Sequence, residues 1–249
     1  MSLLTLTDLT VTFGPFTALD HIDLTIDEGE LRFLIGPNGA GKTTLIDTIT
    51  GRTRPTHGTI TFDNTDITRT PEHRIVRHGI GRTFQTSVVF EELTVIENVD
   101  LAASSRLTPW RLLRRAPTTP PDALAVLDRV DLTHLAHKPA ATLSHGQRQW
   151  LEIAMLLAQK PRLLLLDEPV AGMNAEERTR TGELLTHIAH DHTIVVIEHD
   201  MDFLRRYAHQ VTVLHEGRIL THGDLTTVQN DPKVREVYLG RTTTQETPA

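Results

Sequence analysis

GPNGAGKT, residues 36–43, follows the compact apolar run Leu31–Ile35 and leads into a helical pattern. This order of strand, glycine-rich loop and helix is typical of a phosphate loop, in which backbone amides and a helix N-terminus face anionic oxygens. In such a loop Lys42 can reach the β- and γ-phosphates of a nucleotide, and the Thr43 hydroxyl can ligate magnesium. Thr44 stands where a dinucleotide-binding fingerprint needs its third glycine, which argues against that alternative. We expect the following residues to bind the nucleotide: Gly36, Pro37, Asn38, Gly39, Ala40, Gly41, Lys42, Thr43 and Thr44.

A second motif lies about 120 residues further along the chain, where the apolar run Leu163–Leu166 ends in Asp167 and Glu168. A buried strand that delivers two carboxylates at its end is typical of the Walker B motif of nucleotide hydrolases. We expect Asp167 to hold magnesium through water, and Glu168 to polarise the water that attacks the γ-phosphate. The phosphate loop upstream favours this assignment over a plain strand end.

The composition excludes several classes of protein. The 249 residues suffice for one large domain or two small ones, and a hydrophobic content of 39% can fill a sizeable core. Asp and Glu number 32 against 25 for Lys and Arg, so the net charge of −7 is opposite to the basic surface of most duplex-binding domains. The chain has no cysteine, which excludes disulfides, thiolate zinc sites and a cysteine nucleophile. We expect no nucleic-acid partner.

The chain carries no pattern typical of secretion or of a membrane span. Its first twelve residues alternate apolar and polar positions and include Asp8, which predicts a strand rather than a signal peptide. The densest apolar run, Leu163–Leu166, is far shorter than the roughly 18 residues that a spanning helix needs.

The hydrophobic pattern changes twice along the chain. Short alternating segments up to residue 32 predict antiparallel strands and hairpins, whereas residues 86–158 predict a mostly helical region. Prolines interrupt residues 107–121, where we expect an excursion of the chain. The last third alternates strand and helix patterns, which predicts a parallel sheet. The polar stretch 241–249 is expected to be a disordered tail.

LSHGQ, residues 143–147, begins an amphipathic helix. Ser144 is a helix N-cap residue, so its hydroxyl and the amides of Gly146 and Gln147 can form an anion site. The motif resembles LSGGQ, the signature found only in ATP-binding-cassette ATPases, with His145 in place of the first glycine. In that family the signature faces the γ-phosphate bound by a second cassette, so the resemblance implies ATP contacts for Ser144, His145, Gly146 and Gln147. We expect the His145 ring to point to solvent; the alternative places it beside the γ-phosphate of the partner.

The resemblance covers almost the whole chain and implies an α/β fold of the P-loop NTPase type. Such a cassette, here residues 1–240, has a RecA-like core with an antiparallel β-subdomain and an inserted α-helical subdomain near 86–158. Phe13 resembles the aromatic residue that stacks on adenine. Gln85 resembles the glutamine that contacts magnesium or the attacking water and links to the transmembrane partner. His199 resembles the switch histidine, which contacts the γ-phosphate and orients Glu168. Asn174 stands where many cassettes carry Asp after Walker B, and it keeps a hydrogen-bonding side chain without the charge. The resemblance implies that Asn174 contacts the nucleotide.

The resemblance also bears on the cargo. Cassettes of branched-chain amino acid importers also carry asparagine at the position of Asn174. Within that group, residues 143–153, 169–173, 198–201 and 230–240 look like the ATPase of urea importers. This implies an ATP-hydrolysing subunit that uses ATP and Mg²⁺ to power uptake of urea or a related small amide, with branched-chain amino acids as the alternative cargo. Its partners would be transmembrane permease subunits, a second cassette and, indirectly, an extracytoplasmic binding protein. It would act in the cytoplasm, on the inner face of the membrane.

Two rival classes are open at this point. A soluble cassette ATPase that acts on DNA or ribosomes would carry long coiled coils, or two cassettes joined by a basic linker, and the sequence has neither. A regulatory protein that binds ATP without hydrolysing it would have lost Glu168 or His199, and both residues are present.

Overall fold

The structure, a computed structural model, describes residues 1–83, 89–104 and 121–239. The chain divides into two compact units, which we call unit 1 (Met1–Glu72 with Val195–Ala249) and unit 2 (His73–Ile194). Gln85, most of the expected excursion at 107–121 and the expected tail lie outside the described residues.

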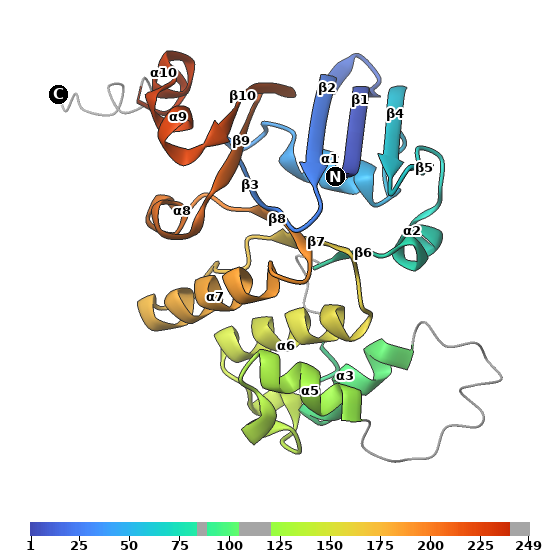
Figure 1. Ribbon diagram of the computed structural model, residues 1–249, viewed down its shortest axis with the longest axis vertical. Coiled ribbons are helices and arrows are strands. Elements are labelled where there is room, and N and C mark those ends of the chain that lie inside the picture. The colour runs from blue at the N-terminus through green and yellow to red at the C-terminus, as the bar shows by residue number, and fades with distance from the viewer. Residues whose placement is uncertain (84–88, 105–120, 240–249) are drawn as a thin grey trace. The chain divides into compact units, whose positions relative to one another are not determined.

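The first sheet of unit 1 is antiparallel, as predicted. It has the strand order β2-β1-β4-β5 and is formed by β1 (Ser2–Phe13), β2 (Phe16–Asp27), β4 (His57–Phe62) and β5 (Thr65–Asp66) (Figure 1). β1 and β2 are single strands of 12 residues each, not the separate short segments that the sequence pattern predicted. Asp8 and His21 adopt left-handed backbone, with φ of 49° and 51°, where the register between the two strands shifts. These bulges interrupt the apolar alternation without ending the strands.

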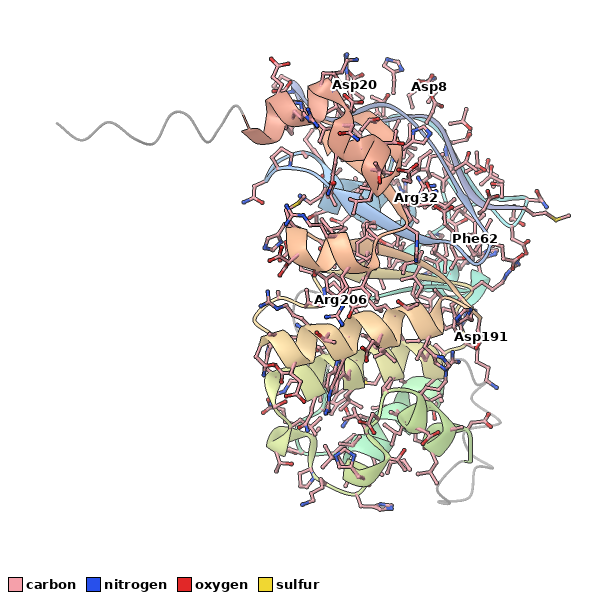
Figure 2. All side chains as sticks on the ribbon, turned by 60° about the vertical axis from the view of Figure 1, so that its left-hand side comes forward. Asp8, Asp20, Arg32, Phe62, Asp191 and Arg206 are labelled. Atoms are coloured by element: carbon pink, nitrogen blue, oxygen red, sulfur yellow. The ribbon has the colours of Figure 1, made fainter. Side chains whose placement is uncertain are left out.

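Asp8 joins two histidines at this bulge (Figure 2). It accepts a hydrogen bond from His21 Nδ1, and its other oxygen lies 3.0 Å from His57 Nε2. The bond with His21 lowers the pKa of Asp8 and raises the pKa of His21. Because these side chains are exposed, water screens the cluster and its contribution to stability is small.

The second part of unit 1 is built on β3 (Leu31–Ile35), which pairs in parallel with β9 (Gln210–His215) and confirms the predicted parallel arrangement. β10 (Arg218–Asp224) pairs antiparallel with β9, so the parallel arrangement predicted for the last third of the chain does not include this strand. Every residue of β3 is buried, including Arg32, which is 7% exposed and donates to Thr212 Oγ1 at 2.8 Å (Figure 2). The helices of the unit are α1 (Lys42–Ile49), α8 (Met201–Tyr207), α9 (Leu225–Asn230) and α10 (Pro232–Leu239).

Unit 2 contains the parallel pair β6 (Ile80–Arg82) and β7 (Leu163–Asp167). Three of its helices, α3 (Val95–Ser104), α5 (Pro121–Arg129) and α6 (His145–Ala158), pack on one another (Figure 1). α6 buries the residues whose spacing predicted it, Trp150, Ile153, Ala154 and Leu157. The other elements in the described part of unit 2 are α2 (Glu72–His78), η1 (Thr133–Leu135), η2 (Ala140–Thr142), α7 (Ala175–Ile188) and β8 (Thr193–Ile197), the last of which continues into unit 1.

Length and apolar content together decide whether a helix can cross a membrane. Over the described ranges, no helix has enough of both to do so.

Candidate nucleotide-binding site

The phosphate loop lies in unit 1 between β3 and α1. Gly41 occupies the N-cap position of α1 and gives the helix no side-chain hydrogen bond, and the first turn of α1 carries no acidic residue. No carboxylate of the first turn therefore competes for these amides, and the positive end of the helix can attract an external anion.

Glycines let this loop run close to neighbouring backbone. A Cβ on Gly36 would lie 2.2 Å from the Leu214 carbonyl oxygen, and one on Gly41 would lie 2.7 Å from a carbonyl oxygen of β2. The Gly217 N–H donates to the Ala40 carbonyl at 3.0 Å, so the turn between β9 and β10 holds the loop from outside. The path of the loop thus depends on glycine at positions where any side chain would collide.

Lys42 folds back over the loop that precedes it. Its Nζ donates to the carbonyl oxygens of Gly36 at 2.8 Å and Pro37 at 3.2 Å, so the ammonium lies inside the curve of the loop. An ammonium at the open N-terminus of a helix fits the β- and γ-phosphates of ATP. The exposed Thr43 hydroxyl and the Asp167 carboxylate are oxygen ligands of the kind that Mg²⁺ prefers.

His199 follows β8 in a turn that Glu198 holds in place. The Glu198 side chain is buried, and its Oε2 accepts from the backbone N–H groups of His199 at 3.1 Å and Asp200 at 3.4 Å. Asp200 then caps α8 by accepting from the N–H groups of Asp202 and Phe203. His199 itself is exposed, as a side chain that contacts a bound nucleotide must be.

Phe13 ends β1 with a side chain that is 52% exposed, so it is not a core residue of the strand. Phe16, its partner across the hairpin, is 62% exposed. Unit 1 therefore presents two aromatic side chains to solvent at this turn. Adenine stacking by Phe13 stays a prediction.

Asp167 ends β7 with a side chain that is 4% exposed. Its Oδ2 lies 3.6 Å from Nη2 of Arg82, whose side chain is also buried, and its backbone N–H donates to Thr83 Oγ1 at 3.1 Å. The parallel pairing of β6 with β7 brings both neighbours to the end of β7. The guanidinium offsets a carboxylate charge that would be costly to bury alone.

Glu168 has a left-handed backbone, with φ of +51°, which is uncommon for a residue that has a side chain. Its carbonyl accepts from the Ala171 N–H at 3.1 Å and closes a tight turn. Strain of this kind persists where the surrounding structure imposes it, and it is frequent at functional sites. A cavity of about 590 Å³ in unit 2 borders Glu168 and Asp167, and its wall includes Thr83, His145, Gln149, Ala171 and Gly172.

The signature turn confirms the predicted cap and adds a neighbour. Ser144 Oγ accepts from the Gln147 N–H at 3.2 Å, while the Ser144 N–H donates to Gln147 Oε1 at 3.0 Å, which completes a capping box. Glu177 of α7 reaches the same turn, because its Oε1 accepts from Ser144 Oγ at 3.3 Å. A Cβ on Gly146 would lie 2.6 Å from that oxygen. The predicted anion site at the head of α6 thus lies next to a carboxylate of the same chain.

Asn174 caps α7. Its Oδ1 accepts from the N–H groups of Glu176 at 3.0 Å and Glu177 at 2.9 Å, and its own N–H donates to Glu177 Oε2 at 3.1 Å. The side chain therefore supplies helix-capping hydrogen bonds where an Asp would also supply a charge. A contact between Asn174 and nucleotide stays a prediction.

The His145 ring makes a contact with the protein that the sequence did not predict. Although the residue is exposed, its Nε2 lies 3.0 Å from the Ala171 carbonyl oxygen. The ring reaches this oxygen because α7 packs its N-terminus against the first turn of α6, as the contact between Ser144 and Glu177 shows. The cavity of unit 2 thereby brings His145 together with Asp167 and Glu168.

Sequence analysis missed Arg82, Thr83, Glu177 and Glu198. Arg82 and Thr83 lie just before Gln85 in the sequence, and no local pattern places them beside β7. Glu177 follows Asn174 by three residues, which is the spacing of a capping box, and that spacing was the available signal.

A family model described as ABC transporter matches residues 19–171, more than half of the chain. The chain belongs to this family, and it is an ATP-hydrolysing subunit of a transporter that uses ATP with Mg²⁺. Among solved structures, the ADP conformation of MJ1267, an ATP-binding cassette of an ABC transporter, superposes with a TM-score of 0.84 at 31% identity, covering 96% of this chain and 99% of that one. This confirms the predicted cassette fold.

A second family model, described as branched-chain amino acid ATP-binding cassette transporter, matches residues 218–242. The chain is 35% identical over 249 residues to the high-affinity branched-chain amino acid transport ATP-binding protein BraF of Pseudomonas aeruginosa, covering 96% of this chain and 98% of BraF. It is 37% identical over 251 residues to LivG of Salmonella typhimurium, with the same coverage. The chain is therefore of the branched-chain amino acid (LivG/BraF) type. These relatives do not support the expected urea cargo, and the alternative cargo fits them better.

Proposed function

We propose that this chain powers the import of branched-chain amino acids. The observation that carries the cargo is the match of residues 218–242, which contain β10, α9 and α10, to the cassette model of branched-chain amino acid transporters. The full-length likeness to BraF and LivG agrees with it. Urea is the rival cargo that the experiment below tests.

The proposed chemistry assigns a task to each motif residue. Lys42 and the amides of the phosphate loop bind the β- and γ-phosphates, while Thr43 and Asp167 hold Mg²⁺. The metal, when bound, supplies positive charge that offsets the charge on the phosphate oxygens. Glu168 accepts a proton from the attacking water, and His199 orients Glu168 and contacts the γ-phosphate.

The proposed assembly needs more than one chain. Signature residues of one copy, Ser144, His145, Gly146 and Gln147, would face the γ-phosphate held by a second cassette. Phe13 would stack on adenine, and Gln85 would link the site to the permease. The Gln85 loop and the stretch around residues 90–98 would form the groove that receives a short cytoplasmic helix of that permease. Such a complex holds the cassette at the inner face of the membrane and takes its cargo from an extracytoplasmic binding protein.

Substitution of Glu168 tests the chemistry. Glu168→Gln keeps the size of the side chain but cannot accept a proton, so ATP turnover should fall at least about 100-fold while ATP affinity is retained. Gel filtration in ATP and Mg²⁺ should then show a trapped dimer. Lys42→Ala serves as the contrasting variant, because it should lose nucleotide binding itself. Unchanged turnover in Glu168→Gln would remove this residue from the mechanism.

Uptake by the assembled transporter tests the cargo. The chain would be reconstituted in vesicles with its permease subunits and binding protein, and uptake of radiolabelled leucine and urea compared with ATP inside. We expect leucine uptake that Glu168→Gln abolishes. Urea uptake without leucine uptake would overturn the proposed cargo and leave the assignment as an ATPase intact.

A further inference from the structure

The His145 ring packs against the turn that follows β7. Its Nε2 lies 3.0 Å from the Ala171 carbonyl oxygen, and a Cβ on the next residue, Gly172, would lie 3.2 Å from the same nitrogen. Gly172 also has φ of +72°, a conformation that favours glycine. A side chain at position 172 would therefore crowd the ring and would also need a left-handed backbone.

The partners of His145 Nε2 determine where its proton lies. A carbonyl oxygen can only accept, so Nε2 must donate to Ala171. Gln149 Nε2 lies 3.4 Å from the same ring nitrogen, which would bring two N–H groups face to face. Gln149 Oε1 is buried, and within the described part of the chain it has no hydrogen-bond partner. Exchanging the oxygen and nitrogen of this amide removes the conflict at the ring, because Oε1 then also accepts from His145 Nε2–H.

Ala171 connects this hydrogen bond to Glu168. The Ala171 N–H donates to the Glu168 carbonyl at 3.1 Å, while the Ala171 carbonyl accepts from His145. Ala171 thus closes the turn through its N–H and links it to α6 through its carbonyl oxygen. The turn begins with the left-handed backbone of Glu168, a conformation that persists only when its surroundings impose it.

We propose that His145 is a positioning residue that braces the turn of Glu168 by donating from Nε2 to the Ala171 carbonyl. The proposal rests on the proposed function, in which the Glu168 carboxylate accepts the proton of the attacking water. His145 takes no part in proton transfer. Its effect is on the fraction of time that the Glu168 carboxylate spends in the productive position.

Hydrogen bonds other than that of His145 keep the start of α6 and the start of α7 together when His145 is changed. Ser144 Oγ still donates to Glu177, and Asn174 still caps α7. We therefore expect substitutions of His145 to loosen the turn without unfolding unit 2, so that their kinetic effect can be read apart from stability.

The test compares glutamine with asparagine at position 145 in the purified full chain. The amide nitrogen of glutamine is separated from Cβ by as many bonds as His Nε2 is, whereas the nitrogen of asparagine is one bond short. His145→Gln should keep a higher kcat than His145→Asn, because only the glutamine amide reaches as far as His Nε2. His145→Asn should lower kcat about tenfold with little change in KM for ATP. Arg180→Ala, which removes only an exposed partner of Glu176, is the matched control and should change neither value.

Two readouts without nucleotide complete the test. Nitrogen-15 NMR should show His145 with its proton on Nε2 in the parent protein. Amide hydrogen exchange at Ala171 and Met173, whose N–H groups close the turn, should be faster in His145→Asn and unchanged in His145→Gln. Equal kcat and equal exchange in the two variants would overturn the proposal, and so would a proton on Nδ1. If Glu168→Gln retained full turnover in parallel, the proposed function would fail instead.

Discussion

Gly146 lies in the first turn of α6, where the Glu177 carboxylate covers its Cα. A Cβ at this position would lie 2.6 Å from Glu177 Oε1 and 2.7 Å from Glu177 Cδ. Gly146→Ala must therefore displace the carboxylate, which loses its bond with Ser144 Oγ and its capping bond with the Asn174 N–H. These two exposed contacts contribute about 2 kcal/mol together. Alanine gains up to about 1 kcal/mol over glycine in a helix, so the variant should be destabilised by about 1 kcal/mol.

The effect of Gly146→Ala on the free energy of unfolding should change sign once the Glu177 carboxylate is removed. In a Glu177→Ala background both contacts are already lost, so Gly146→Ala should stabilise the protein by up to about 1 kcal/mol. Urea unfolding without nucleotide measures all four proteins of the cycle, and the melting temperature should move by about 2–4 °C for each kcal/mol. In the control background Glu176→Ala, Gly146→Ala should remain destabilising. Stabilisation by Gly146→Ala in the parent protein would refute the reasoning.

Three further predictions concern other sites. Thr181→Val removes the hydroxyl that lies 2.8 Å from the buried Trp150 Nε1, and it should lower the free energy of unfolding by about 1–3 kcal/mol; a loss below about 0.5 kcal/mol in urea titration would contradict it. Gly36→Ala should weaken ATP binding, measured with a fluorescent analogue, because its Cβ would meet the Leu214 carbonyl at 2.2 Å; unchanged affinity with a native circular dichroism spectrum would count against this. Burial lowers the pKa of His192, so the folded chain binds this proton less readily than the unfolded chain and stability should fall as the pH drops below about 6.5. His192→Asn should flatten that fall in melting temperature, and a profile as steep as that of the parent would show that other groups cause it.

Local patterns in the sequence sufficed for the parts of the site that depend on neighbouring residues. The spacing of glycines and Lys42 predicted a strand, loop and helix, and the structure places β3 at Leu31–Ile35 and α1 at Lys42–Ile49. Ser144 predicted a helix cap for the same reason, since a capping hydroxyl bonds to amides within its own turn. The sequence did not predict the full length of β1 and β2, because bulges at Asp8 and His21 break the alternation of apolar and polar residues.

Contacts between distant segments could be seen only in the tertiary structure. Arg82 lies beside Asp167 because β6 pairs with β7, and the sequence between the two strands says nothing about that pairing. Packing of α7 against α6 likewise places Glu177 over Gly146, and the His145 ring lies against the turn that begins at Glu168. Sequence patterns report the periodicity of one element at a time. The partner of a buried charge or a ring nitrogen is chosen by how separate elements pack, because only packing brings groups far apart in the chain within hydrogen-bonding distance.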